Sequence, residues 1–249
     1  REELIFQKRL IDLSRTAYQR GIVMFSDFLN LNELNILHTL SKEELYSGYE
    51  TFGGYAAAER QMVAFLPDAL YYDYRYPISV LRISPANRKF AEDLSHRDFL
   101  GGILNLGIER SCLGDLLVED SVCHVFVTDA MADFICDQLT RIRHTVVRTE
   151  KIDETAFSFA PRLETIKGTV ASVRLDTVLS VAFPMSRSRL TGLIEGGKVF
   201  VNGKLITSNG YRLKEEDIIS VRGMGKLVYQ GILSETKKGR QYIQVGKYI

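Results

Sequence analysis

Residues 186–204, SRSRLTGLIEGGKVFVNGK, constrain the fold of this chain more than any other stretch. A short amphipathic helix is interrupted by two consecutive glycines, and a strand then leads into Asn202-Gly203. Asn-Gly is a strong hairpin signal because both central residues of a type I′ turn need a positive φ. The stretch therefore predicts a helix, a strand and a tight return into a second strand.

The predicted helix opens with two arginines, Arg187 and Arg189. A helix N-terminus is the positive end of the helix dipole, so acidic side chains there would be stabilising. Ser186 is a suitable N-cap, but Arg189 stands where a capping box has Glu or Gln. Free backbone N–H groups and two guanidinium groups together favour a bound phosphate. The helix alone leaves a second interpretation equally open, a pair of solvated surface arginines.

The charge of the chain is divided unevenly. The 249 residues, 45% hydrophobic and 25% charged, are enough for two or three soluble globular domains. From Arg174 to the end there are 13 Lys and Arg against 6 Asp and Glu, whereas residues 1–173 hold 19 against 25. The split indicates that the last third of the chain meets a polyanion.

Other composition signals point away from membranes, metals and disulfides. No apolar run approaches the roughly 20 residues of a membrane helix, and the first ten residues are charged, unlike a signal peptide. The cysteines, Cys112, Cys123 and Cys136, lack C-x-x-C spacing, and the four histidines are scattered. We expect a cytoplasmic monomer without cofactor or metal, with cysteines that are simply small apolar side chains.

Residues 1–75 are predicted to form a helical domain. Helical periodicity runs from the start of the chain to Gly21, and NELNILHTL at 32–40 predicts a second helix. Residues 47–67, SGYETFGGYAAAERQMVAFLP, are interpreted as a Gly-rich loop and a helix that ends before its proline. Three residues offer N-caps after the first helix: Ser26, Asp27 and Asn32.

Residues 76–160 show a β-α-β-β-α-β order. The strands are ISVLRIS, GDLLVED, VCHVFVT and TVVRTEKI, and the helices begin at the expected caps Ser95 and Asp129. This is the ferredoxin-like order, which RNA-recognition-motif domains share. The aromatic sequence pattern of that motif is missing, so order alone does not predict RNA binding by the sheet.

Residues 161–249 form the third predicted domain of an α+β chain. Helices are expected at 175–182 and 187–195 with Pro184 between them, followed by the strands KVFVNGK and DIISVRG and a β-rich tail. PRLETIKGTVA, around Pro161, is either a linker or a connecting strand.

The stretch RLDTVLSVAFPMSRSRLTGLIEGGKVFVNGK, followed by DIISVRGMGK, resembles the S4 (S-four) domain. This RNA-binding module is shared with the small-subunit ribosomal protein of that number, and the resemblance covers about 170–226. It implies that two helices and a hairpin form a curved basic surface on structured RNA. Thr191 and Glu195 replace basic residues found in many members, so the outer end of the second helix is expected to contribute less. The predicted RNA-binding residues are Arg174, Ser186, Arg187, Arg189, Lys198, Asn202, Lys204, Arg212, Arg222 and Lys226.

Over nearly its whole length the chain resembles the YlmH family. FLNLNELNIL, FGGYAAAER, HRDFLGGILNLGIER, GDLLV and TKKGR occur in this order. The family has a helical N-terminal part, a middle domain similar to an RNA-recognition motif and a C-terminal S4 domain. Its members are similar in role to RqcP, a small S4 protein of ribosome-associated quality control. The resemblance implies rRNA of the large ribosomal subunit and peptidyl-tRNA as partners.

Several motifs are better explained by structure than by catalysis. HRD at 96–98 matches a kinase triplet, but the other kinase motifs are missing. RLD at 174–176 is similar to the catalytic motif of pseudouridine synthases, yet a helix continues after Asp176, which is interpreted as structural. GMG at 223–225 is too short for a dinucleotide loop. YYDYRY at 71–76 is predicted to pack between the first two domains rather than to stack on bases.

Two classes of function stay open. One is a non-catalytic RNA-binding factor of the ribosome. The other is an RNA-modifying enzyme, of the pseudouridine synthase or methyltransferase type, that its S4 domain delivers to RNA. A pocket with perturbed acids or a cofactor cleft in the middle domain would favour the enzyme, and a solid core would favour the binding factor.

Overall fold

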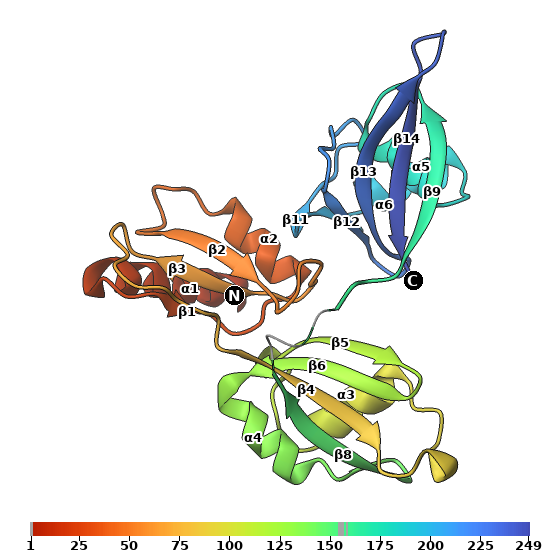
Figure 1. Cartoon of the computed structure of the whole chain (residues 1–249). Helices are drawn as coiled ribbons and strands as arrows, with labels where there is room; N and C mark the ends of the chain where they lie inside the picture. The colour runs from red at the N-terminus through yellow and green to blue at the C-terminus, as the bar shows by residue number, and fades with distance from the viewer. Residues whose placement is uncertain (1, 154–156, 158) are drawn as a thin grey trace. The chain divides into compact units, whose positions relative to one another are not determined.

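The computed structural model describes residues 2–153, 157 and 159–249 (Figure 1). The chain divides into two compact units, which span 1–159 and 160–249. Helices and sheets occur in both, so the predicted α+β class is confirmed. None of the described helices is long and apolar enough to cross a membrane.

The N-terminal part of unit 1 is two helices packed on a small sheet. The helices are α1 (Glu2–Arg20) and α2 (Leu31–Thr39), and the antiparallel sheet has the order β1-β3-β2. Its strands are β1 (Met24–Phe25), β2 (Gly48–Phe52) and β3 (Met62–Leu66). Buried Leu10, Leu34, Leu37 and Phe65 lie between helices and sheet. The N-cap of α2 is Asn30, in a capping box with Glu33, and not Ser26, Asp27 or Asn32 as predicted.

The prediction of a helix before Pro67 is wrong, because residues 47–67 contain the strands β2 and β3. In β3 the residues 62–65 are all buried, and a short continuous apolar run fits a buried strand as well as a helix. A Cβ on Gly53 would clash with the carbonyl group of Arg60, so the glycine lets the connection fold back tightly on itself. The N-terminal domain is therefore mixed rather than helical.

The middle domain has the ferredoxin-like order that the sequence predicts. It runs β4 (Ile78–Pro85), α3 (His96–Leu104), β5 (Leu113–Glu119), β6 (Val122–Thr128), α4 (Asp129–Gln138) and β8 (Thr145–Ile152). A two-residue β7 (Arg141–Ile142) and the 3₁₀ turns η1 (Arg88–Phe90) and η2 (Arg110–Cys112) complete it. The antiparallel sheet has the order β5-β6-β4-β8-β7, and α3 and α4 pack on one face of it (Figure 1).

The two expected caps of this domain differ in outcome. Ser95 caps α3, and its hydroxyl and the Asp98 carboxylate form a capping box. Asp129 was expected to cap α4 but is its first helical residue, with Thr128 at the N-cap. The Asp129 carboxylate instead accepts hydrogen bonds from the Ser79 hydroxyl (2.6 Å) and from Arg75 (2.9 Å).

The other face of this sheet is partly closed by the chain's own N-terminal part. Phe126, on β6, is fully buried, and the ring of Tyr55 stacks on it with centroids 5.1 Å apart. Phe28 and Met62 join the same cluster as Val80 of β4. An RNA-recognition motif binds bases on exposed aromatics of its sheet. Phe126 is not exposed in this way.

Half-buried arginines join the two parts of unit 1. The Arg60 side chain donates hydrogen bonds to the carbonyl groups of Leu113 (Nε, 2.9 Å) and Arg110 (Nη2, 3.1 Å), and more weakly to that of Phe28 (3.4 Å). Arg110 in turn donates to the carbonyls of Leu113 (2.8 Å) and Gly114 (3.1 Å). We call Arg60, Arg110 and the neighbouring Asp115 the Arg60 network.

Asp115 completes this network from β5. Its carboxylate accepts hydrogen bonds from the Tyr55 hydroxyl (2.6 Å) and from the backbone N–H groups of Glu59 (2.8 Å) and Arg60 (3.0 Å). Burial and then the charge of Arg60 lower the pKa of Arg110 to about 10, while burial lowers the pKa of Arg60. Polar groups of both parts are thus satisfied across their junction.

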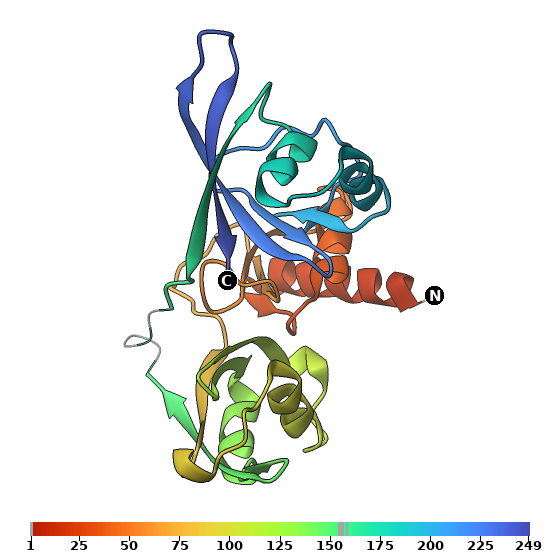
Figure 2. The same cartoon turned by 90° about the vertical axis from the view of Figure 1, so that its right-hand side faces the viewer.

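Unit 2 is a six-stranded antiparallel sheet with two helices on one face (Figure 2). The helices are α5 (Leu175–Ala182) and α6 (Arg187–Glu195), with the bounds that the sequence predicts. The strands are β9 (Leu163–Val170), β10 (Val199–Val201), β11 (Lys204–Leu205), β12 (Ile218–Val221), β13 (Gly225–Glu235) and β14 (Gln241–Tyr248). Their order is β11-β10-β12-β13-β14-β9, and β9 pairs with β14 along its whole length.

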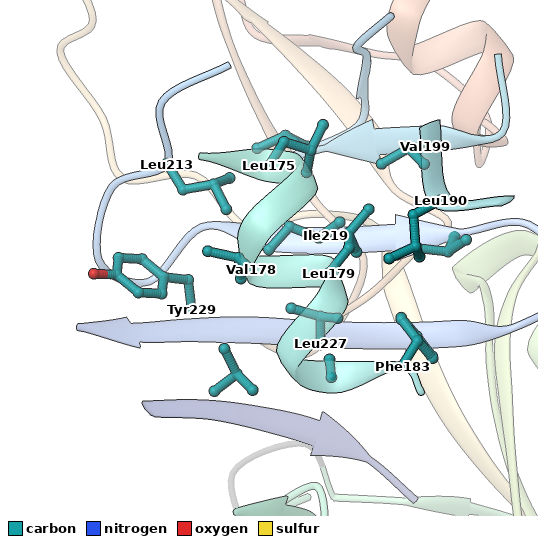
Figure 3. Packing of buried hydrophobic residues seen from close by; sticks show 14 of the residues in the cluster. Leu175, Val178, Leu179, Phe183, Leu190, Val199, Leu213, Ile219, Leu227 and Tyr229 are labelled. Carbon is teal, nitrogen blue, oxygen red and sulfur yellow. The ribbon is translucent and has the colours of Figure 1, made fainter. Parts of the chain in front are cut away.

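The core of unit 2 lies between these helices and the sheet. Figure 3 shows Leu175, Val178 and Leu179 of α5 pointing at Ile219 of β12 and Leu227 of β13. All five side chains are fully buried. Burial of each such side chain contributes about 1.5–3 kcal/mol, so this layer fixes how α5 and α6 lie on the sheet.

Candidate nucleic-acid interface

The N-terminus of α6 is a basic helix end without acidic residues in its first turn. Ser186 is its N-cap, and the Ser186 hydroxyl accepts a long hydrogen bond from the N–H of Arg189 (3.4 Å) and lies 3.2 Å from the Ser188 hydroxyl. Arg187 and Arg189 are exposed, and neither side chain has a hydrogen bond or ion pair to another described residue. Both guanidinium groups are therefore free to meet a phosphate beside the positive helix end.

A second basic group lies at the start of α5. Arg174 is bridged through its backbone to Arg212, and both residues are exposed. The Arg174 side chain is engaged: Nε and Nη2 donate to the Asp176 carboxylate at 3.1 and 2.6 Å. Asp176 is buried and also accepts a hydrogen bond from the N–H of Thr177 (2.9 Å), consistent with a structural role.

Asn202 serves the hairpin itself. Asn202 and Gly203 have φ of +49° and +79°, the positive values that a type I′ turn requires. The Asn202 amide donates to Asp217 (2.8 Å) and its oxygen accepts from the N–H of Ile218 (2.9 Å), so its polar atoms hold the turn against β12. Lys204, which follows the turn, is exposed and has no partner among the described residues.

The remaining predicted cations lie on the sheet. The N–H of Arg222 donates to the carbonyl of Lys198 (2.9 Å), which brings these two exposed residues together at one end of β10 and β12. The Arg222 guanidinium lies 5.5 Å from the centre of the Phe200 ring. Lys226 is half-buried, with its Nζ atom 5.0 Å from the centre of the Tyr248 ring.

The structure thus divides the ten predicted residues rather than joining them. Arg187 and Lys198 lie at opposite ends of α6, a nine-residue helix about 13 Å long. Seven of the ten form three groups, which are the α6 N-terminus, the α5 start with Arg212, and the sheet end with Arg222 and Lys198. The other three are Asn202 and Lys204 at the hairpin and Lys226 beside Tyr248. Glu195, one of the two departures from the S4 pattern, accepts a hydrogen bond from Asn209 (2.8 Å) and so belongs to a loop contact.

Sequence reasoning missed the acids that orient two of the predicted residues, Arg174 and Asn202. Asp176 was assigned to helix geometry, but its bidentate contact with Arg174 was not predicted, although the two are only two residues apart. Asp217 holds Asn202 across 15 positions of sequence and also accepts from the N–H of Lys214 (2.8 Å). The R-x-D spacing could have predicted the Arg174–Asp176 contact. We recognise no sequence signal for the Asn202–Asp217 contact.

Unit 1 holds a mostly apolar cavity of about 310 Å³. The described residues that line it are Phe52, Gly54, Arg75, Tyr76, Ile78, Val80 and Phe157, and none of these carries a carboxylate. Tyr74 and Tyr76 pack against Phe25 and Tyr76 also against Phe52, in line with the packing role expected for YYDYRY, whereas Tyr71 is 93% exposed. Within the described residues, no three His, Cys, Asp or Glu side chains cluster as metal ligands would.

The comparisons with known proteins fall on the same regions. The S4 domain model matches residues 173–219, and the model described as "Putative RNA-binding domain in YlmH" matches 73–156. The "Ribosome-associated protein quality control protein P2" of Bacillus subtilis (strain 168) is 28% identical over 244 residues, which cover 96% of this chain and 93% of that protein. The structure of "Cell division protein ylmH from Streptococcus pneumoniae" shares the fold, with a TM-score of 0.52 and 22% identity over 62% of this chain and 93% of that one.

Proposed function

Because the chain belongs to the YlmH family, we propose that it is a non-catalytic factor of ribosome-associated quality control. In this proposal its S4 domain binds rRNA of the large ribosomal subunit, and the protein engages the peptidyl-tRNA that the subunit retains. It acts as a cytoplasmic monomer and needs no cofactor or metal.

The α6 N-terminus is the observation that supports this most directly. Two exposed guanidinium groups without described partners stand beside the free N–H groups of a helix end. A-form RNA hides most base edges in a deep groove, so a protein recognises it mainly by shape and by phosphate and sugar contacts. Separate basic groups on the S4 domain suit phosphate contacts along such a rigid duplex.

The proposal of a ribosomal target is supported by the similar Bacillus subtilis protein and not by the side chains of the interface. The Bacillus subtilis protein is named as ribosome-associated and as a quality-control protein, and 96% of this chain aligns with it. Unit 1 and unit 2 have separate cores, so each can hold its own partner. Tethering two modest sites in one chain raises the effective concentration of the second partner, which favours subunits that still carry tRNA.

Nothing in the described residues favours the RNA-modifying alternative. The described lining of the unit 1 cavity consists of aromatic and aliphatic residues, a glycine and Arg75. These residues supply no carboxylate pair for acid–base chemistry. The half-buried arginines with lowered pKa values belong to the Arg60 network, where they donate to backbone carbonyls.

Gradient sedimentation tests the proposed function. In cells that accumulate stalled nascent chains, the protein should move into the large-subunit peak, and Arg187→Glu should return it to the top of the gradient. Arg20→Glu, at an exposed arginine ending α1, is the matched control and should sediment like the natural protein. Sedimentation with small subunits, or none at all, would contradict the quality-control role and leave RNA binding to be tested separately.

A further inference from the structure

The turn between β13 and β14 is a charged element that the S4 match does not include. We call Thr236–Arg240 the basic tip; its sequence is TKKGR, and the S4 model ends at residue 219. Lys237, Lys238 and Arg240 are all exposed. Glu235 directly precedes the tip, and the three cations against this one acid leave the segment with a net charge of +2.

Hydrogen bonds order the backbone of the basic tip. The N–H of Thr236 donates to the carbonyl of Arg240 (2.7 Å), the N–H of Gly239 donates to that of Thr236 (2.8 Å), and the N–H of Arg240 donates to the Thr236 hydroxyl (3.0 Å). Gly239 has φ +72°, as in a three-residue hairpin loop closed by a left-handed glycine. Lys237 and Lys238 therefore stand next to each other at the end of an ordered ribbon.

The side chains of the tip divide into one anchor and two free cations. Arg240 donates to the carbonyl of Thr169 (3.1 Å), which ties its guanidinium to the end of β9. Lys237 and Lys238 have no hydrogen bond or ion pair to any other described residue. A Lys ammonium group without a protein partner is a compact point charge suited to phosphate.

The tip continues the basic surface at the start of α5. Gln241 pairs with Val170, the last residue of β9, from which the chain passes directly to Arg174 and α5. Arg174 is bridged to Arg212, so the tip and these arginines lie at the same end of the sheet. Figures 1 and 2 show the tip projecting beyond α5 and α6 within unit 2.

We propose that the basic tip is a second RNA-binding element, in which Lys237 and Lys238 contact phosphates of a duplex that α6 holds elsewhere. The inference rests on the proposed function for its ligand class and adds to it a site outside the S4 match. Charge complementarity favours RNA over an apolar protein surface, because the tip is cationic and adjoins further arginines. Ile232 and Leu233, 47% and 49% exposed below the tip, are the feature that a protein partner would use instead.

The test measures binding of the full chain to an RNA stem-loop longer than one turn of duplex, by fluorescence anisotropy over a series of salt concentrations. Lys237→Ala with Lys238→Ala should weaken binding about tenfold at moderate salt and flatten the slope of log K against log salt by about two units. Lys8→Ala with Lys42→Ala, two exposed lysines of unit 1, is the matched control and should change neither. The urea midpoint of the tip variant should equal that of the natural chain, because neither lysine has a hydrogen bond or ion pair to another described residue.

Each contrary result has one meaning. If Arg187→Ala weakens RNA binding and the tip variant does not, the tip inference is wrong and the proposed function stands. If neither variant weakens RNA binding, both the tip inference and the proposed function are wrong. If the tip variant binds the stem-loop normally but no longer sediments with large subunits, the tip contacts protein and the RNA inference is overturned. A photo-crosslinking residue in place of Lys238 should label nucleotides other than those labelled from position 187, and labelling no RNA would also overturn it.

Discussion

Two pairs of arginines, one pair in each unit, have opposite uses. In unit 1, Arg60 and Arg110 are half-buried, and their donors are directed at backbone carbonyls 2.8–3.4 Å away. In unit 2, Arg187 and Arg189 are exposed and hold no described partner. The role of a cation therefore follows from what its donors already hold and not from its charge. The first pair stabilises a junction and the second is available to a ligand.

The comparison also explains why the charge split is informative. Residues 1–173 have more acids than bases, and several of their arginines are engaged within the protein, as in the Arg60 network and the Arg75–Asp129 pair. In the last third, the basic excess lies largely on exposed side chains. Exposed unpaired cations set the salt dependence of nucleic-acid binding, whereas buried paired ones do not.

Removing a core side chain of unit 2 should have the largest effect and test whether the units are independent. Leu179→Ala takes a fully buried side chain from the centre of the core and should cost about 2–5 kcal/mol of the free energy of unfolding. Hydrogen exchange followed by mass spectrometry should show lost protection in 160–249 and unchanged protection in 2–153. Equal loss of protection in both units would contradict the division.

Arg60→Ala should separate stability from RNA binding. The carbonyl groups of Phe28 and Arg110 lose the Arg60 donor, and a buried unsatisfied acceptor costs about 1–3 kcal/mol. We expect the urea midpoint of unit 1 to fall while the affinity of the chain for an RNA stem-loop stays the same. Weaker RNA binding in a variant that remains folded would show that unit 1 takes part in that contact.

Arg187→Ala should give the converse result. Loss of a phosphate contact at the α6 N-terminus should weaken RNA binding by about 1–3 kcal/mol and flatten the salt slope by about one unit. The urea midpoint should not move, because the side chain has no described partner. Arg20→Ala is the matched control in unit 1; if it weakens binding equally, overall charge and not this helix end governs affinity.

Asn202→Ala should have the smallest effect. It tests whether Asn202 stabilises the protein, as Arg60 does, or is available to a ligand, as Arg187 is. The substitution removes the hydrogen bonds to Asp217 and Ile218 and puts alanine at a positive φ, which should cost about 1–2 kcal/mol of stability. The salt slope of RNA binding should not change, because the amide is uncharged and already bonded within the hairpin. A flatter slope with unchanged stability would assign Asn202 to the RNA instead.

Local signals predicted unit 2 better than the start of unit 1. Pro184 and the glycines at 196 and 197 end α5 and α6 in the sequence itself, and Asn202-Gly203 defines its own turn. For β3 the deciding force was burial beneath α1 and α2, which a five-residue apolar run does not reveal. The N-cap Asn30 was missed because the start of α2 depends on a long-range contact. Leu29, the residue before the cap, is bridged to Gln61, and the apolar pattern of α2 does not reveal this pairing.

The exposure of the predicted RNA-binding residues could be predicted from the sequence, but their arrangement could not. Exposure of Arg187, Arg189 and Lys204 follows from residue type and helical or turn position. The separation of Lys198 from Arg187 depends on the length of α6 and on the packing of β10 against β12. Likewise, the Arg60 network joins residues about 50 positions apart, a distance over which sequence periodicity carries no information.

Asp176 reduces the net positive charge of the α5 start, yet it also fixes the orientation of the Arg174 side chain. An arginine loses rotamer freedom when a ligand fixes it, at about 0.5–1.5 kcal/mol for a long side chain at an interface. The bidentate contact at 2.6 and 3.1 Å has already fixed the guanidinium plane in the unbound protein. A ligand that meets Arg174 along its remaining edge encounters a preorganised fork rather than a mobile chain. Among the cations around the two helices, Arg174 therefore has a weaker net charge but a better defined orientation.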